Sequence, residues 1–155
     1  MRLWHYKLLP YLPNQQLVSQ WRELSSIFSS QNKYILINYV YDHPKEYLKH
    51  YSNLVLDEFK NRGYKVRSFD AYNKYFEGIE DSEVNFPEHN YRYLRQNFYN
   101  LQEKFDRNQK GFDKALQERL EEMFIKETFQ QDPNDFIILG VDLAIEKDKG
   151  VNYGL

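Results

Sequence analysis

The amino-acid sequence predicts a mainly α-helical protein: a compact single-domain helical fold with irregular, aromatic-rich loops and a helical C-terminal extension. In four separate segments, apolar residues recur at the spacing of one helix face. A length of 155 residues suits one domain. Apolar residues make up 41% of the chain and aromatic residues 17%, which is enough to build a core and excludes wholesale disorder.

The first expected helix opens at Asn14, a residue type that favours the N-cap, and continues to about Phe28. Its core stripe consists of Leu17, Trp21, Leu24 and Phe28. Arg22 and Glu23 are adjacent in its middle, and neighbours at i and i+1 do not face each other on a helix. They are therefore no simple surface ion pair, and Glu23 is a carboxylate at the edge of an aromatic-rich core face.

The segment YILINYVY (34–41) is rich in β-branched and aromatic residues, so we expect a strand or a buried extended segment there. Asp42, followed by Pro44 in the first turn, marks the start of a second helix. Gly63 is expected just beyond the C-terminal cap of this helix. The apolar face of the helix carries Leu48, Tyr51, Val55 and Phe59.

Beyond the second helix, residues 64–86 are expected to form an irregular packed loop with short helical pieces. A third helix follows Pro87, and a fourth follows a break at NQKG (108–111). The segment FIILGVDLAI (136–145) is compatible with a strand or a buried helix. The expected apolar faces are Leu94, Phe98, Leu101 and Phe105 in the third helix, and Phe112, Leu116, Leu120, Met123 and Phe124 in the fourth.

Residue types and motifs that are absent from the chain reduce the number of possible function classes. The chain has no cysteine, which excludes disulfides and cysteine-ligated metals. The four histidines have no metal-ligand spacing, so we expect neither a metal site nor a cofactor. The phosphate-binding patterns GxxxxGK[ST] and GxGxxG and the hydrolase pattern GxSxG are absent. Residues 1–18 lack a long apolar stretch, so we expect a cytoplasmic protein without signal peptide or membrane span.

Charge is distributed unevenly along the chain. The formal net charge is −2, but residues 1–75 carry 11 Lys/Arg against 6 Asp/Glu, a balance of +5. Residues 76–155 carry 10 against 17, a balance of −7. The basic half could face a polyanion while the acidic half faces away, although chance segregation of solvated charge would give the same pattern.

The N-terminus itself could carry chemistry. An α-amino group has a pKa of about 7.7–8.0, far below that of lysine, so part of it is neutral at pH 7. A neutral amine can attack a carbon electrophile such as a sugar C1′ and form an imine. It needs a nearby carboxylate that stabilises positive charge on the sugar and carries protons. MRLWH (1–5), followed by a helix that bears Glu23, supplies both groups.

The start of the chain resembles the pyrimidine-dimer DNA glycosylase family, particularly a small bacterial branch that begins Met-Arg-Leu-Trp-His. The resemblance covers roughly residues 1–110, which we expect to form the helical domain of that family. Residues 111–155 fall outside it and are expected to be a C-terminal extension packed on that domain. The motifs, in order, are RLWH (2–5), LP (12–13), QQL (15–17), RE (22–23), NYVYD (38–42), FKNRGYKV (59–66) and PEHNYRYLRQNFYNL (87–101).

The resemblance implies a DNA base-excision repair enzyme, an N-glycosylase with abasic-site lyase activity, whose N-terminus lies against the first helix. In such an enzyme the terminal amine displaces a damaged base through a Schiff base at C1′, and β-elimination then nicks the abasic strand. The family's essential glutamate corresponds to Glu23, and the arginine beside it corresponds to Arg22, a phosphate contact. The implied partner is damaged or abasic double-stranded DNA.

This chain departs from the family's phage pattern at several positions. Residue 2 is Arg, and a large residue there preserves the initiator methionine, so the reactive amine is that of Met1. Gln16 stands where the pattern has a histidine, and Ser26 stands where it has a second helix arginine. The basic aromatic tail of the phage pattern is absent.

The predicted catalytic residues are Met1 and Glu23, and alternatives remain for the others. Trp4 and Trp21 are expected to be core anchors, not base-stacking residues. The chain could also be a non-catalytic helical nucleic-acid-binding protein, or an interaction module whose acidic half binds protein. The oligomeric state is left open. The residues predicted to bind substrate or DNA, each with a purely structural alternative, are Arg2, His5, Gln15, Gln16, Arg22, Tyr41 and His89.

Overall fold

The computed structural model describes residues 1–31 and 33–131. Within these ranges the regular structure is entirely helical, with no strand, so the predicted mainly α-helical class is confirmed. The elements are the 3-10 helix η1 (Tyr6–Tyr11), α1 (Asn14–Ser30), the 3-10 helix η2 (Asn38–Asp42), α2 (Lys45–Asn61), α3 (Asp70–Tyr75), α4 (Tyr91–Asp106) and α5 (Lys114–Phe129).

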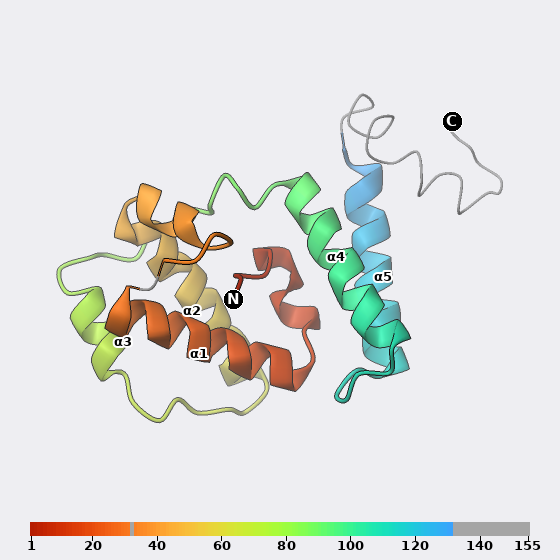
Figure 1. Cartoon of the computed structure of the whole chain (residues 1–155), viewed down its shortest axis with the longest axis horizontal. Coiled ribbons are helices and arrows are strands. Elements are labelled where there is room, and N and C mark those ends of the chain that lie inside the picture. The colour runs from red at the N-terminus through yellow and green to blue at the C-terminus, as the bar shows by residue number, and fades with distance from the viewer. Residues whose placement is uncertain (32, 132–155) are drawn as a thin grey trace.

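The helices surround the start of the chain. In Figure 1 the N-terminus lies in the middle of the molecule, with α1, α2 and α4 around it. Helix α1 contacts α2 and α3, while α5 contacts α4 and η1. The two ends of the described chain therefore meet different surroundings: the first residues lie among helices, and α5 lies on the outer side of α4 (Figure 1).

One continuous hydrophobic cluster forms the core and includes residues from every α-helix. The predicted stripes account for much of it, because the 3.6-residue period places their members on one helix face. Trp21 is only half-buried, in a ring of aromatic side chains that includes Phe28 and Phe59. The stripe members buried as predicted are Leu17, Leu24, Phe28, Leu48, Tyr51, Val55, Phe59, Leu94, Phe98, Leu101, Leu120 and Phe124.

The segment 34–41 is not a strand or a buried extended segment as predicted. It is a turn followed by η2, with Ile37 N–H donating to the Tyr34 carbonyl at 2.9 Å. Only Ile37 and Val40 are buried, and a separation of three residues matches the 3-10 period. The apolar residues Tyr34, Ile35 and Leu36 are exposed.

Two helix starts differ from the prediction by one to three residues. Helix α2 begins at Lys45 with Pro44 as its N-cap, and not at Asp42. His43 is extended, as expected for a residue before proline. Helix α1 begins at Asn14, which is thus a helix residue, with Pro13 as the N-cap. Gly63 has φ +79°, the left-handed conformation predicted for the residue after the cap.

Helix α5 packs along α4 and reaches η1. The rings of Phe98 and Phe124 stack with centroids 4.1 Å apart, and Lys7 Nζ lies 2.7 Å from Glu127 Oε1. The α5 core residues Leu120 and Phe124 belong to the same cluster as the N-terminal core. The predicted strand or helix at 136–145 lies outside the described residues.

Candidate active site at the N-terminus

Residues 1–5 form a non-helical segment that enters the interior of the molecule. Leu3, Trp4 and His5 are at most 5% exposed. A buried segment outside regular structure cannot leave its N–H and C=O groups unpaired. Side chains from α1, α2 and α4 supply the partners, and they thereby fix the position of the terminal segment.

Helix α1 and helix α2 bind the segment through two polar side chains. Gln20, on α1, accepts a hydrogen bond from Trp4 N–H at 2.8 Å and donates from Nε2 to the Arg2 carbonyl at 3.0 Å. Tyr51, on α2, donates its hydroxyl to the Trp4 carbonyl at 2.6 Å. Three backbone groups, which belong to Arg2 and Trp4, are satisfied in this way.

Helix α4 binds the other side of the segment. Asn97 Oδ1 accepts from His5 N–H at 2.8 Å, and the Tyr93 hydroxyl donates to the Leu3 carbonyl. Asn97 is fully buried and lies 92 positions further along the chain than its partner. The N-terminal segment is thus held between helices from distant parts of the sequence.

Glu23 lies next to the first peptide bonds of the chain. Its Oε2 accepts a hydrogen bond from Arg2 N–H at 3.2 Å, and its Oε1 lies 3.3 Å from Gln20 Nε2. Burial raises the pKa of this carboxyl, because desolvation penalises the charged form. The Arg2 N–H, the terminal α-ammonium and the Arg2 guanidinium act in the opposite direction. A carboxyl with a raised pKa can exchange a proton nearer to neutral pH.

The α-amino group of Met1 is the candidate nucleophile that the sequence predicts. Its positive charge acts on the pKa of Glu23, which places the amine in the electrostatic neighbourhood of the carboxylate. The Met1 residue is 39% exposed, so the terminus is open to solvent although residues 3–5 are buried. An α-amine near a half-buried carboxylate can form an imine, and the carboxylate can transfer protons during that reaction.

One arginine lies near the carboxylate. The Arg2 guanidinium stands 5.3 Å from the centroid of the Trp4 ring, a cation–π contact, and its charge lowers the pKa of Glu23. Arg22 is exposed on α1, one position before Glu23, and neighbours at i and i+1 do not face each other on a helix. Of the residues predicted from the sequence, the structure therefore brings together Met1, Arg2 and Glu23.

His5 and His89 belong to a buried aromatic cluster and not to a solvent-facing site. Their ring centroids are 5.5 Å apart, and Tyr39 places its hydroxyl 2.7 Å from His89 Nε2. Burial lowers the pKa of His5 to about 4 and that of His89 to about 3, so both rings are neutral at pH 7. His5 Nδ1 accepts from Lys7 N–H and caps η1, while Asn90, next to His89, caps α4.

The remaining predicted residues lie away from Glu23. Gln15 is exposed, and its Oε1 would lie 3.7 Å from a Cβ at Gly111, beside the α4–α5 connection. Gln16 is half-buried on the same turn of α1. Tyr41 lines a separate hollow of about 390 Å³ together with Tyr75. Burial raises the pKa of the Tyr41 hydroxyl.

Sequence reasoning missed the residues that hold the segment in place. Gln20 follows Leu17 by three and precedes Leu24 by four, so it lies on the buried stripe of α1. A polar residue on such a stripe must find hydrogen-bonding partners in the interior, and this signal could have identified it. Tyr51 was assigned only as a core residue, and nothing in the sequence relates Asn97 to His5.

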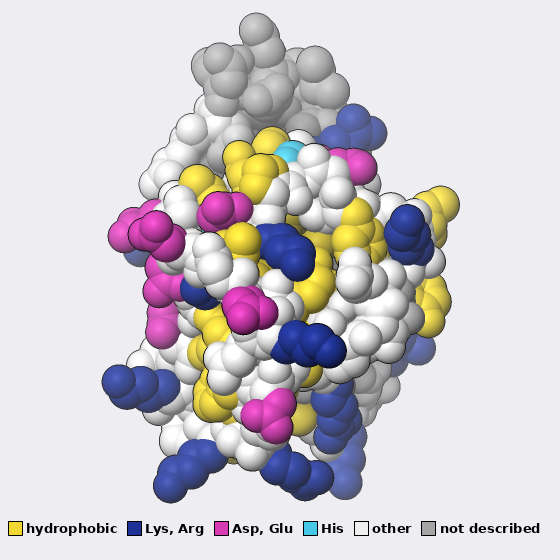
Figure 2. Space-filling model, turned by 90° about the vertical axis from the view of Figure 1, so that its left-hand side faces the viewer, with side chains coloured by type: hydrophobic (Ala, Val, Ile, Leu, Met, Phe, Trp, Pro, Cys, Tyr) yellow, Lys and Arg dark blue, Asp and Glu magenta, His cyan; other side chains and the backbone are white. Residues whose placement is uncertain are grey.

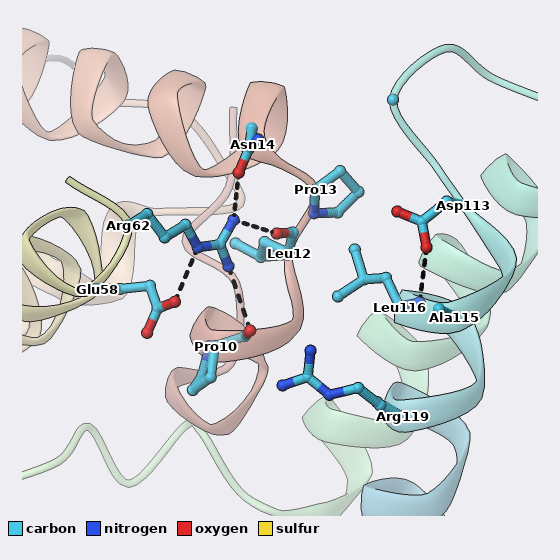
Figure 3. A pocket seen from close by; sticks show the side chains of 11 residues that line it. Pro10, Leu12, Pro13, Asn14, Glu58, Arg62, Asp113, Ala115, Leu116 and Arg119 are labelled. Atoms are coloured by element: carbon cyan, nitrogen blue, oxygen red, sulfur yellow. Dashed lines mark hydrogen bonds and ion pairs between the residues drawn. The ribbon is translucent and has the colours of Figure 1, made fainter. Parts of the chain in front are cut away.

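A groove of about 470 Å³ opens between η1 and the start of α5 (Figure 3). Arg62 faces it, but its guanidinium is already fully engaged with α2, η1 and α1. Arg119 points into the groove from α5 (Figure 3) and stacks on Tyr11. The acceptors of Arg62 are Glu58, Leu12, Asn14, Leu9 and Pro10, the last at 3.2 Å. This arginine holds η1 against α2 and so supports the chain segment that leads into α1.

The surface around the described elements is mixed in charge. Figure 2 shows mostly Lys and Arg in the lower part of one face and exposed hydrophobic side chains between the charges. Among the described residues, no three His, Cys, Asp or Glu side chains gather as a metal site would require. Within the same part of the chain, no helix is long and apolar enough to cross a bilayer.

The helices and the site define a helical protein whose N-terminus is fixed beside a half-buried carboxylate, an arrangement that suits imine chemistry. Residues 1–71 match the family model for pyrimidine dimer DNA glycosylases, which confirms the resemblance over this range. The matched range contains Met1, Arg22 and Glu23 and ends before the stretch 87–101. No curated protein and no solved structure matches the chain. The family match supports a DNA-repair glycosylase in general.

Proposed function

We propose that this protein is a DNA N-glycosylase with abasic-site lyase activity that acts through the α-amine of Met1 and the carboxylate of Glu23. One observation carries the proposal: buried side chains of three helices fix the terminal segment so that Arg2 N–H donates to Glu23 at 3.2 Å. The family match over residues 1–71 supports DNA as the substrate.

The chemistry begins with the neutral amine of Met1 attacking C1′ of the damaged nucleotide. The bond between C1′ and the base breaks, and the base leaves with its bonding electrons and takes up a proton. The C1′–O4′ bond then breaks, O4′ leaves with its bonding electrons and takes up a proton, and the nitrogen lone pair forms the iminium ion with C1′ of the opened sugar. Removal of a proton from C2′ then expels the 3′ phosphate by β-elimination, and water releases the amine.

Glu23 acts in two ways during this reaction. As a carboxylate it stabilises the positive charge that develops on the sugar and the iminium. As a carboxyl with a raised pKa it carries protons to and from the sugar ring as the ring opens. Its half-buried position strengthens both effects, because charges interact more strongly where water is partly excluded.

Cations near the site bind the phosphate backbone of the substrate. Arg22 is exposed on α1, and the charge of Arg2 acts on the carboxylate of Glu23. A guanidinium pairs with phosphate through two parallel hydrogen bonds. Figure 2 shows further Lys and Arg on one face of the molecule, and such cations attract a polyanion. A substrate of damaged or abasic double-stranded DNA requires the protein to work where the DNA is, in the cytoplasm.

Sodium borohydride trapping on a duplex with one abasic site tests the proposal. Borohydride reduces the imine to a stable amine and leaves protein joined to DNA. We expect an adduct with the wild type and none with the N-terminally acetylated protein. Folded wild-type protein that binds the duplex and gives no adduct would contradict the proposal and leave the non-catalytic DNA-binding alternative.

A further inference from the structure

We propose that Gln20 is a positioning residue that fixes the α-amine of Met1 at working distance from Glu23. This inference rests on the proposed function and adds a residue that acts on the reaction through others. Gln20 lies on α1, three residues before Glu23, and is fully buried. It does not reach the surface where a substrate could touch it.

Both ends of the Gln20 amide are engaged. Its Oε1 accepts from Trp4 N–H at 2.8 Å and lies 3.0 Å from the Tyr51 hydroxyl, whose single proton is shared between Oε1 and the nearer Trp4 carbonyl. Its Nε2 faces the Arg2 carbonyl at 3.0 Å and Glu23 Oε1 at 3.3 Å, so both of its donors have acceptors.

The partners permit one orientation of the amide. Trp4 N–H can only donate, so it must face the oxygen of Gln20. The Arg2 carbonyl and an ionised Glu23 can only accept, so they must face the nitrogen. A flipped amide would oppose donor to donor and acceptor to acceptor in a buried place, at a cost of several lost hydrogen bonds.

One side chain therefore joins the terminal segment to the carboxylate. The Arg2 carbonyl that Gln20 holds is only one residue away from the Met1 amine, so a shift of this carbonyl moves the nucleophile. The same amide restrains Glu23 Oε1, so the two reacting groups share one anchor. A displacement of about 1 Å between reacting groups can lower a rate about 100-fold.

The test replaces Gln20 and measures reaction and binding separately. Gln20→Met keeps the length and bulk of the side chain and removes its hydrogen bonds. The matched control is Gln117→Met, which removes a buried amide that donates to Gln102 at 2.7 Å, between α5 and α4. We expect Gln20→Met to lower the single-turnover trapping rate at least 10-fold while the Kd for abasic duplex changes less than 3-fold. Gln117→Met is expected to leave the trapping rate within 2-fold of wild type.

Gln20→Glu gives a signature that a merely structural role would not produce. It places a second carboxyl about where Nε2 now faces Glu23, and two carboxyls at this distance disfavour each other's charge. The acid limb of the pH profile for trapping is therefore expected to move to higher pH. An unchanged profile, together with a wild-type rate in Gln20→Met, would overturn the proposal.

Two further measurements keep the proposal testable. If Gln20→Met fails to fold, Tyr51→Phe is used in its place. This variant removes the hydroxyl that donates to the Trp4 carbonyl and faces Gln20, and an unchanged trapping rate would count against the proposal.

The second measurement needs no activity: the NMR signal of the 13C-methylated α-amine is followed against pH. In wild type this signal should report the titration of Glu23, and in Gln20→Met the response should weaken. A weakened response without any adduct in wild type would retain the positioning role and reject the lyase function.

Discussion

At the residue scale, Glu23 combines a raised pKa with direct contact to the first peptide bonds of the chain. Desolvation destabilises its charged form, yet a charged form is what the proposed chemistry requires at neutral pH. Sites that sacrifice stability in this manner are characteristic of function. The carboxylate remains in place because Arg2 N–H, Gln20 Nε2 and the terminal charge partly compensate for the lost water.

Glu23→Gln is expected to lower the trapping rate at least 100-fold, which is the usual contribution of a general acid–base group. The variant should be as stable as wild type or more stable at pH 7. The folded pKa of Glu23 is raised above its unfolded value, so its contribution to stability is largest at low pH and declines as pH rises towards the folded pKa. Thermal melts at pH 4 and pH 7 test this: any gain should be present at pH 7 and vanish at pH 4.

The buried His5 and His89 are expected to make the protein less stable at low pH, which is opposite in sign to the effect of Glu23. Their pKa values are lowered to about 4 for His5 and about 3 for His89, so below pH 6.5 the unfolded chain takes up protons that the folded protein does not. Stability should fall by about 1.4 kcal/mol per histidine and pH unit over that range. Urea unfolding between pH 7 and pH 4 measures the slope. His5→Asn keeps an acceptor for Lys7 N–H and should roughly halve the slope; an unchanged slope would refute the assignment.

At the element scale, the terminal segment and α1 form one functional unit. The segment itself has no regular structure, and its geometry comes from partners on α1, α2 and α4. In the proposed mechanism the amine of Met1 reacts, so the length of the segment would matter as much as its composition.

A Gly-Ser extension before Met1 tests this dependence on length. Two added residues move the α-amine by up to about 7 Å, which is too far for Glu23 to assist. We expect loss of the trapped adduct, with a Tm close to that of wild type because Met1 is exposed. The same two residues added at the C-terminus serve as the control. An extended protein that still traps the duplex at the wild-type rate would show that another amine reacts.

The sequence allowed the helices to be predicted but not the irregular elements. The stripes of α1, α2 and α4 are regular enough for the helical period to be recognised without tertiary context. The segment 34–41 was expected to be extended because β-branched residues favour strands, but such residues form strands where a neighbouring strand exists, and the described part of the chain contains no strand. Its Ile37 and Val40 pack into the core from a 3-10 turn instead.

Only those site residues that belong to a local sequence pattern could be predicted. Glu23 stands out from the sequence because it adjoins an apolar stripe and belongs to a family motif. His89 was expected near a helix start, but its position in the interior depends on stacking with His5 across 84 positions of chain. Contacts of that kind are tertiary, and no local pattern records them.

At the scale of the whole molecule, α5 completes the core from the outer side of α4. The stacked rings of Phe98 and Phe124 and the ion pair between Lys7 and Glu127 connect it to both α4 and η1. The division at residue 110 remains a prediction from the family resemblance. Residues 1–71, which match the family model, and the helices beyond them contribute to the same hydrophobic cluster.

Phe124→Ala should therefore destabilise the protein by about 3–5 kcal/mol, the usual range for removal of a buried phenylalanine. Phe124 is 1% exposed and lies in α5, remote in sequence from the terminal segment. We expect the folded variant to trap abasic DNA at close to the wild-type rate when measured below its Tm. Phe129→Ala, at a side chain that is 75% exposed, is the control and should cost little. Equal losses for the two variants would contradict this packing.

The central claim is that the α-amine of Met1 forms the covalent bond to DNA. The most direct measurement is mass spectrometry of the borohydride-trapped complex after chymotrypsin and nuclease digestion. We predict that the sugar remnant is attached to the α-amine in the peptide that begins at Met1. A remnant on Lys7 or any other lysine side chain would contradict the claim, even if strand nicking and trapping were both efficient.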